Sequence, residues 1–523
     1  MKGIDRQDVT YAGILALIVH FVIALALLPV SPLPLSPHLA VFFTADIALM
    51  AVNLIAPVAV LRRHLRWHDP LVWLFLMMLA MSCSALVSVL INPTFTQEYL
   101  EWGSNVFDRI SQNGFLVRLT EAEAVMLCFN MVVLYVNRSG LKGTNEIQAE
   151  PRVALAMLPV CFLFVAGGVF GFMTIWRLGE FSETFTTTMG FLDESLVSGG
   201  NGRYVLLQLL GVAAFPLFLG CSFVALSGRS ATGKRLLTTI VAVLTLGAAL
   251  PSLINGSRLF ALAGIVSTYM QLRHFGVKVG RGVIVLCICF AIGMVLFLTA
   301  SRKNGLAEGS FSSSLRNFGD TATSQLVNRG NEGLSFSFDL DRVGTIAMVI
   351  EFTRGGKEYL FGESLVSSAF GFIQQFSWIT TKTIPEWTLG PETCTEHLSS
   401  WRKVWAYETP PSYAGDLFMQ AGWIGLFPLS LLFGVIFRSV RTRLFRAKTM
   451  LARFAWCYIG FWIAFFPTGE IVLIFNQLVL YLVPVFMLCW ISQLALRGIS
   501  RAGAVTRGRA WAPRDFPKPK VPR

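Results

Sequence analysis

Long apolar runs recur along almost the whole chain and are separated by short polar turns. A helix of about 20 apolar residues is long enough to cross the roughly 30 Å hydrocarbon core of a bilayer. Runs of this kind predict about twelve membrane-spanning helices and therefore an all-α integral membrane protein. The predicted spans lie near residues 11–30, 40–61, 70–91, 119–136, 153–176, 205–226, 236–254, 257–272, 283–300, 414–437, 452–467 and 471–495.

The composition agrees with this pattern. Of the 523 residues, 54% are hydrophobic and 14% are charged, whereas about a quarter of the residues of a soluble domain carry a charge. Eight of the nine cysteines fall inside apolar runs, which leaves Cys394 as the one thiol in a polar loop. No nucleotide-binding motif and no metal-binding spacing occurs in the sequence. We therefore expect neither a cofactor nor a metal.

Lysine and arginine predict the orientation, because short cytoplasmic loops retain positive charge. Twenty-eight basic residues fall on the side of both termini, five fall in the opposite short loops, and ten lie in the long polar segment 300–413. Both termini are therefore predicted to be cytoplasmic and the long segment external, which in a bacterial inner membrane means periplasmic. The net charge of +13 is spread over these cytoplasmic turns, so it does not indicate a nucleic-acid partner.

This orientation divides the chain into four parts. Residues 1–299 hold spans one to nine, and residues 300–413 form the large external loop. Residues 414–495 hold spans ten to twelve. Residues 496–523 form a basic tail rich in proline and glycine, which we interpret as a disordered cytoplasmic extension near anionic lipid.

The external segment contains two apolar stretches. Val343, Ile346, Ala347, Val349 and Ile350 have the spacing of one helix face, with Asp341 as the predicted cap. The stretch Phe361–Ile379 is interrupted by glycines and polar residues, which favours a helix lying in the membrane surface over a span. The segment is either a lid over an external cavity or a plain loop domain packed on the bundle.

Arg258 lies in the short turn Asn255-Gly256-Ser257-Arg258, at the predicted external mouth between spans seven and eight. A guanidinium group presents a planar fork of donors that suits phosphate oxygens, and the start of the following helix adds a positive end. The alternative is an interfacial arginine that snorkels to lipid headgroups. Position alone does not separate the two interpretations.

Several short motifs in residues 236–437 resemble a known family. They are Asp341-Arg342 before an apolar helix, then Tyr359-Leu360-Phe361-Gly362-Glu363-Ser364-Leu365, then Ile384-Pro385, then Gly415-Asp416-Leu417 and Gly422-Trp423-Ile424-Gly425-Leu426. Their order resembles that of the Wzy-type polymerases of oligosaccharide repeat units. With Ser257-Arg258 they also resemble the related O-antigen ligases, although the histidine that ligases place before the last motif is here replaced by Ser412-Tyr413.

The resemblance implies a GT-C-like, metal-independent membrane glycosyltransferase that joins glycans carried on polyprenyl diphosphate, as in lipopolysaccharide synthesis. Arg258 and Arg342 match the diphosphate-binding arginines of the family, and Arg302 is a further candidate for the same site. An activated diphosphate leaving group needs anion stabilisation and positioning, and a base for the acceptor hydroxyl. For that base Asp416 is the first choice, followed by Glu363 and then Asp320.

Three functions remain open at this stage. The first is a polymerase that transfers a growing lipid-linked glycan to an incoming lipid-linked unit, with membrane lipid and a chain-length regulator protein as further partners. The second is a ligase with the same donor and another acceptor. The third is a transporter or flippase for the lipid-linked glycan, which would need charged residues deep in several spans. Asp46, Glu121, Glu123 and Glu470 lie mostly near the predicted span ends, and His20 is interpreted as a packed or hydrogen-bonded span residue.

Overall fold

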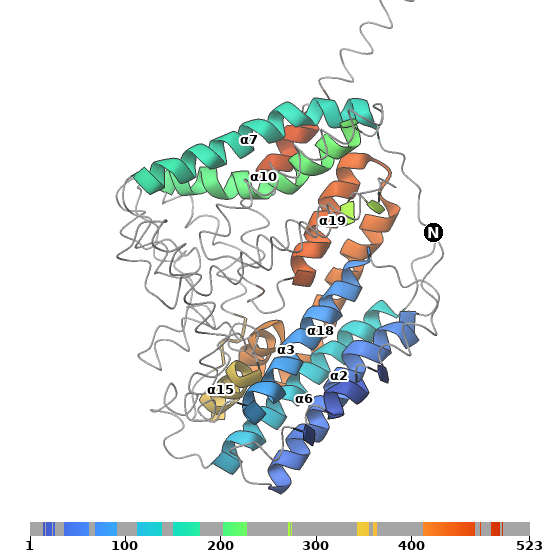
Figure 1. Cartoon of the computed structure of the whole chain (residues 1–523), viewed down its shortest axis with the longest axis vertical. Coiled ribbons are helices and arrows are strands. Elements are labelled where there is room, and N and C mark those ends of the chain that lie inside the picture. The colour runs from blue at the N-terminus through green and yellow to red at the C-terminus, as the bar shows by residue number, and fades with distance from the viewer. Residues whose placement is uncertain are drawn as a thin grey trace, which may run out of the picture.

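The computed structural model of the chain is all-helical in the parts that it describes (Figure 1). These parts are residues 14–15, 17–22, 25–26, 36–61, 68–91, 112–138, 150–177, 202–226, 270–271, 273–274, 343–354, 359–362, 412–465, 471, 483–491 and 494. The helices are α2 (Pro37–Leu61), α3 (Pro70–Ile91), α6 (Gln112–Asn137), α7 (Pro151–Arg177), α10 (Gly202–Leu226), α15 (Val343–Arg354), α18 (Ser412–Arg446) and α19 (Met450–Phe465).

Four of these helices are long and apolar enough to cross a membrane, over Pro37–Ile55, Gly114–Asn137, Pro151–Gly171 and Ser412–Arg446. The helical membrane character predicted from the apolar runs is therefore confirmed. Seven of the predicted spans lie in the described residues, and each coincides with a helix. Spans seven to nine, 236–300, lie almost entirely outside the described residues, as do the tail 496–523 and the predicted surface helix after Gly362.

The main bundle consists of α2, α3, α6, α15, α18 and α19, which share one large apolar core. In Figure 1 α2, α3, α6 and α18 run along the lower half of the molecule, and α6 packs between α2 and α18. This core brings together aromatic side chains from three helices: Phe129 of α6, Tyr413 and Phe433 of α18, and Phe461 of α19. Dispersion and apolar burial between these side chains hold the helices together.

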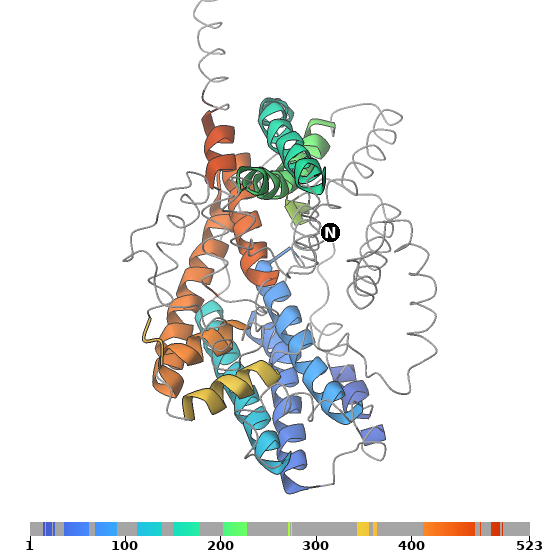
Figure 2. The same cartoon turned by 90° about the vertical axis from the view of Figure 1, so that its left-hand side faces the viewer.

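A second, smaller core joins α7 and α10, which lie across the upper end of the bundle (Figures 1 and 2). The two helices are antiparallel, since Gly168 of α7 lies against Gly211 of α10 while Phe170 contacts Tyr204. A Cβ on Gly211 would come within 2.6 Å of the Gly168 Cα, so small residues permit this close approach. The start of α19 completes the core with Met450 and Phe454, so α19 links both cores.

The bundle has two chemically different ends. At one end the Arg441 guanidinium on α18 binds Asp69, with Nε 2.8 Å from Oδ1, and donates to Asn137 Oδ1 on α6 at 2.9 Å. Asp69 also accepts from the Leu71 amide and so caps α3. At the other end α15 lies across the helices (Figure 2). The start of α6 contacts α15 there through Arg118.

Two sequence-based expectations need correction. The span predicted at 119–136 begins earlier, at Gln112, so Glu123 lies near the middle of α6 rather than near a span end. Residues 112–118 were missed because Gln112, Asn113 and Arg118 lower the apolar character of that stretch. The helix predicted after Asp341 is present as α15, yet it is buried on nearly all sides from Val343 to Ile350 instead of along one face.

Candidate functional site

The helix α18 reverses direction at Ala421–Gly422. Gly422 has φ 61° and ψ −150°, and the backbone of Ala421 is also non-helical. The Tyr413 and Phe433 ring centroids are only 5.1 Å apart, whereas a straight helix would separate residues 20 positions apart by about 30 Å. Residues 412–421 therefore fold back along the remainder of α18, and we call them the inner arm. The span predicted at 414–437 therefore contains a break after its first third, which the prediction did not include.

The inner arm carries polar side chains that are fully enclosed. Asp416 is 0% exposed and Gln420 is 1% exposed. Asp416 Oδ1 accepts from Gln420 Nε2 at 3.0 Å, and its Oδ2 accepts from the Ile471 backbone amide at 3.0 Å. At the start of the arm the Ser412 hydroxyl accepts from the Gly415 amide at 3.4 Å, in the position of an N-cap. Both carboxylate oxygens of Asp416 are thus engaged in fixing the arm and the chain near residue 471.

The segment Tyr359–Gly362 closes the far end of the inner arm. The Leu360 amide donates to the Met419 carbonyl at 3.1 Å, and the Phe361 amide donates to the Gln420 carbonyl at 2.8 Å. The Gly362 amide donates to Gln420 Oε1 at 3.0 Å. These bonds satisfy carbonyls that the end of a helix leaves without partners. Gln420 therefore connects Asp416 to the residue that precedes Glu363.

Two of the motifs that carry the family resemblance are in direct contact as a result. The Tyr359 hydroxyl lies 2.7 Å from the position that a Cβ on Gly422 would take. The first motif lies in the segment predicted to be external and the second around the start of the tenth predicted span, about 60 positions later in the chain. Their contact forms a compact structure around Asp416 and Gln420.

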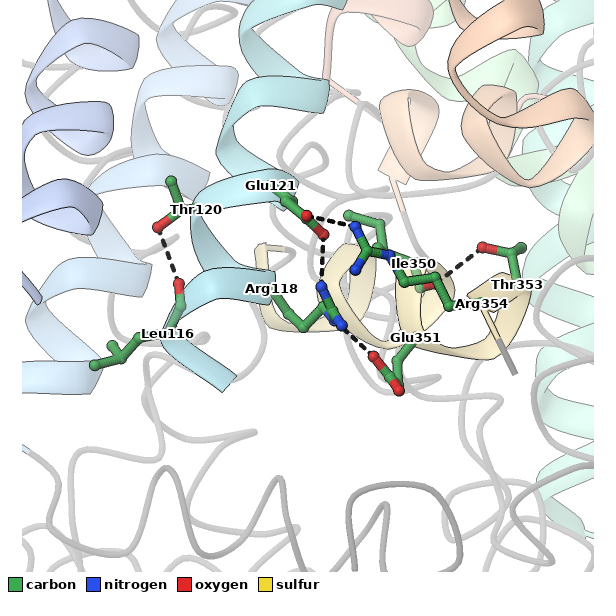
Figure 3. A network of polar contacts seen from close by, with 8 residues as sticks. All are labelled: Leu116, Arg118, Thr120, Glu121, Ile350, Glu351, Thr353 and Arg354. Carbon is green, nitrogen blue, oxygen red and sulfur yellow. Dashed lines mark hydrogen bonds and ion pairs between the residues drawn. The ribbon is translucent and has the colours of Figure 1, made fainter. Parts of the chain in front are cut away.

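An ion-pair network fixes α15 against α6 at the same end of the bundle (Figure 3). Arg118 Nε lies 2.6 Å from Glu351 Oε2, and Arg118 Nη1 lies 3.1 Å from Glu121 Oε2. Arg354 Nη2 lies 2.6 Å from Glu121 Oε1. Two helices that are more than 200 positions apart in the sequence are thereby joined through four alternating charges.

Of the predicted site residues, Asp416 is described, and it lies on the inner arm. Arg258, Arg302, Arg342 and Glu363 lie outside the described residues, as does Asp320. In the chain, Arg342 directly precedes the first residue of α15 and Glu363 directly follows Gly362. The predicted roles of these five residues in diphosphate binding and base catalysis, and that of Asp416 as base, stay predictions.

Sequence reasoning missed Gln420 and the four charged residues of the network. A signal for the network was present, because Arg118 and Glu121 are three positions apart, as are Glu351 and Arg354. Residues at this spacing share one helix face. For Gln420 no such signal exists, since its partners come from separate segments of the chain.

Comparison with protein-family models, with curated proteins and with solved structures finds no match to this chain.

Proposed function

We propose that the protein is a membrane glycosyltransferase that polymerises polyprenyl-diphosphate-linked oligosaccharide repeat units at the external face of a bacterial inner membrane. It transfers the growing glycan from its lipid diphosphate to a sugar hydroxyl of an incoming lipid-linked unit. The observation that carries the proposal is the contact between the segment Tyr359–Gly362 and the inner arm. These segments carry two of the short motifs of the family resemblance, and they meet at the end of the bundle that α15 covers.

Arg258 and Arg342 are the proposed diphosphate ligands, with Arg302 near the same group. The reaction breaks the bond between the anomeric carbon and the diphosphate and forms a new glycosidic bond to the acceptor oxygen. The acceptor proton passes to a carboxylate, for which Asp416 and Glu363 are the candidates. Charge that develops on the diphosphate is stabilised by guanidinium donors aimed at it. No metal is assigned to this step.

The test is reconstitution of the purified protein with a lipid-linked repeat unit and separation of the products by length. We expect a ladder of longer lipid-linked glycans. Arg258→Lys and Arg342→Lys keep the charge but lose the bidentate fork. Each should reduce turnover by roughly 10²–10³-fold, about 2.7–4 kcal/mol, as does the loss of an oxyanion donor elsewhere.

Arg152→Lys is the matched control, because Arg152 is exposed at the start of α7, the helix that packs with α10 in the smaller core. It should polymerise at the wild-type rate. A normal ladder from either Arg258→Lys or Arg342→Lys would contradict the shared diphosphate site. A product only one transfer long, made on a different acceptor, would indicate the ligase instead.

A transporter of the lipid-linked glycan is the second candidate function, and one observation favours it. His20, Asp46 and Glu123 are buried together among the helices, and ionisable residues inside a membrane are frequent in transport proteins. Liposomes that contain the protein and a lipid-linked unit separate the two candidates. Movement of the unit between leaflets without any longer product would support the transporter.

A further inference from the structure

A cluster of three ionisable side chains lies between α2, α6 and the helical residues 17–22, which we call the first helical stretch. His20 Nε2 is 2.8 Å from Asp46 Oδ2, and Glu123 interacts with Asp46 from α6. His20 is 9% exposed, Asp46 is 0% exposed and Glu123 is 1% exposed. We call these three residues the buried triad. It is separate from the ion-pair network with α15, because Glu123 and Glu121 are two positions apart on α6 and so face different sides.

Within the described helices around the triad, little basic charge is available to neutralise it. Residues 70–91 of α3 include no lysine, arginine, histidine or carboxylate, and residues 14–26 include none besides His20. On α2 the other titratable residue is His38, at the helix start. On α6, Arg118 and Glu121 are bound within the network with α15, and the remaining titratable residues are Cys128 and Tyr135. The triad must therefore balance its own charge.

Two carboxylates and one imidazole reach neutrality only when they hold two protons beyond the fully deprotonated state. An ionised carboxylate in an apolar interface is strongly disfavoured unless it has donors. Asp46 Oδ1 has no hydrogen-bond partner among the described residues. A proton held between Asp46 and Glu123, with the second proton on His20 or Asp46, removes this problem. Among the described residues, no group of His, Cys, Asp and Glu side chains is arranged so that it could hold a metal ion.

We propose that the buried triad is a proton-binding site inside the membrane-embedded bundle, with Glu123 as the residue that keeps its proton at neutral pH. The proton shared by Asp46 and Glu123 leaves through Asp46 Oδ2 and the His20 ring, which is the most exposed of the three groups. Its loss leaves one uncompensated negative charge between α2, α6 and the first helical stretch. This charge weakens the packing of the three elements, so the bound proton stabilises the first helical stretch against α2 and α6.

Infrared spectroscopy of the reconstituted protein tests the site without any assay of catalysis. A protonated carboxylic acid has a carbonyl band that is distinct from that of a carboxylate and shifts in heavy water. At neutral pH the band should decrease in Glu123→Gln, because the carboxyl group that carries the proton is then absent. Glu121→Gln is the matched control, since Glu121 is paired with two arginines, and it should leave the band unchanged.

The pH dependence of unfolding is the second readout. In the pH range where the folded wild type still holds this proton and the unfolded chain has lost it, one proton is released on unfolding, so the folding equilibrium constant falls tenfold for each unit of rising pH. Glu123→Gln should lack this dependence.

Should Glu123→Gln not fold, Asp46→Asn replaces it and should shift the carbonyl band by changing the partner of Glu123. An unchanged band in the variant that folds, or an unchanged pH dependence, would overturn the proposal. Neither result bears on the proposed polymerase.

Discussion

At the scale of single residues, Gly422 determines the shape of α18. Its φ of 61° with ψ of −150° lies in a region that is essentially restricted to glycine. The Tyr359 hydroxyl lies only 2.7 Å from the position of an added Cβ, so any side chain there meets both backbone strain and a close contact. The glycine thus allows the inner arm and the segment Tyr359–Gly362 to lie together.

We predict that Gly422→Ala destabilises the protein by about 2–4 kcal/mol, from strain at positive φ and from overpacking against Tyr359. Gly362→Ala is the matched control, because Gly362 has φ 88° but no atom within 4 Å of an added Cβ. Gly362→Ala should lower the free energy of unfolding less, by about 1–2 kcal/mol, from strain alone. The measurement is thermal or chemical unfolding in detergent.

Adding Tyr359→Phe to Gly422→Ala removes the nearest contacting atom and should restore part of the lost stability. The restoration is only partial, because the ring carbons Cζ and Cε1 remain 2.9 and 3.2 Å from the added Cβ. Equal destabilisation by Gly422→Ala and Gly362→Ala, or no restoration by Tyr359→Phe, would show that the contact does not matter.

At the scale of the helices, apolar length predicted most bounds to within a few residues. The spans predicted at 70–91 and 205–226 correspond to α3 and to α10, which begins at Gly202. The reversal of α18 was not predictable in the same way, because the run Ala414–Phe437 is apolar apart from Asp416, Gln420 and Ser430. What breaks this helix is a pair of backbone conformations stabilised by Tyr359–Gly362, and such a distant contact leaves no trace in local hydropathy.

A repeat of seven positions on α6 was a signal that sequence reasoning left unused. Glu123, Asn130 and Asn137 share one face at this spacing. Each has a partner on a neighbouring helix: Glu123 interacts with Asp46, Asn130 Nδ2 donates to Asn53 Oδ1 at 2.8 Å, and Asn137 contacts α18. Polar pairs of this kind specify which helices associate and in what register.

The network between α6 and α15 yields a prediction at the same scale. Arg118 and Glu351 have side chains that are each 17% exposed, whereas those of Arg354 and Glu121 are 51% and 26% exposed. Solvent screens exposed pairs, so the first pair should couple by about 1–2 kcal/mol and the second by less than about 0.5 kcal/mol. Double-mutant cycles with glutamine replacements, read out by unfolding, measure both couplings. Equal couplings would mean that burial does not govern how α15 is held.

At the scale of the whole molecule, the two ends of the bundle differ in the way that the charge pattern predicts. The end with Arg438, Arg441 and Arg138 is rich in basic residues, and Arg438 and Arg441 contact the end of α6 there. The opposite end is covered by α15 and carries the break in α18. Because short cytoplasmic loops retain positive charge, the α15 end should face the outside.

The last prediction tests this orientation in intact cells with a maleimide that does not cross membranes. Phe361→Cys places a thiol on an exposed residue, 73% accessible, beside the break in α18, and Lys448→Cys places one at the basic end, between α18 and α19. The first variant should react in intact cells above the level of the unmodified chain, whose own cysteines give the background. The second should react only after the membrane is opened. The reverse pattern would put the α15 end in the cytoplasm, where a polymerase of externally exposed lipid-linked units could not act, and the proposed function would fail together with the orientation.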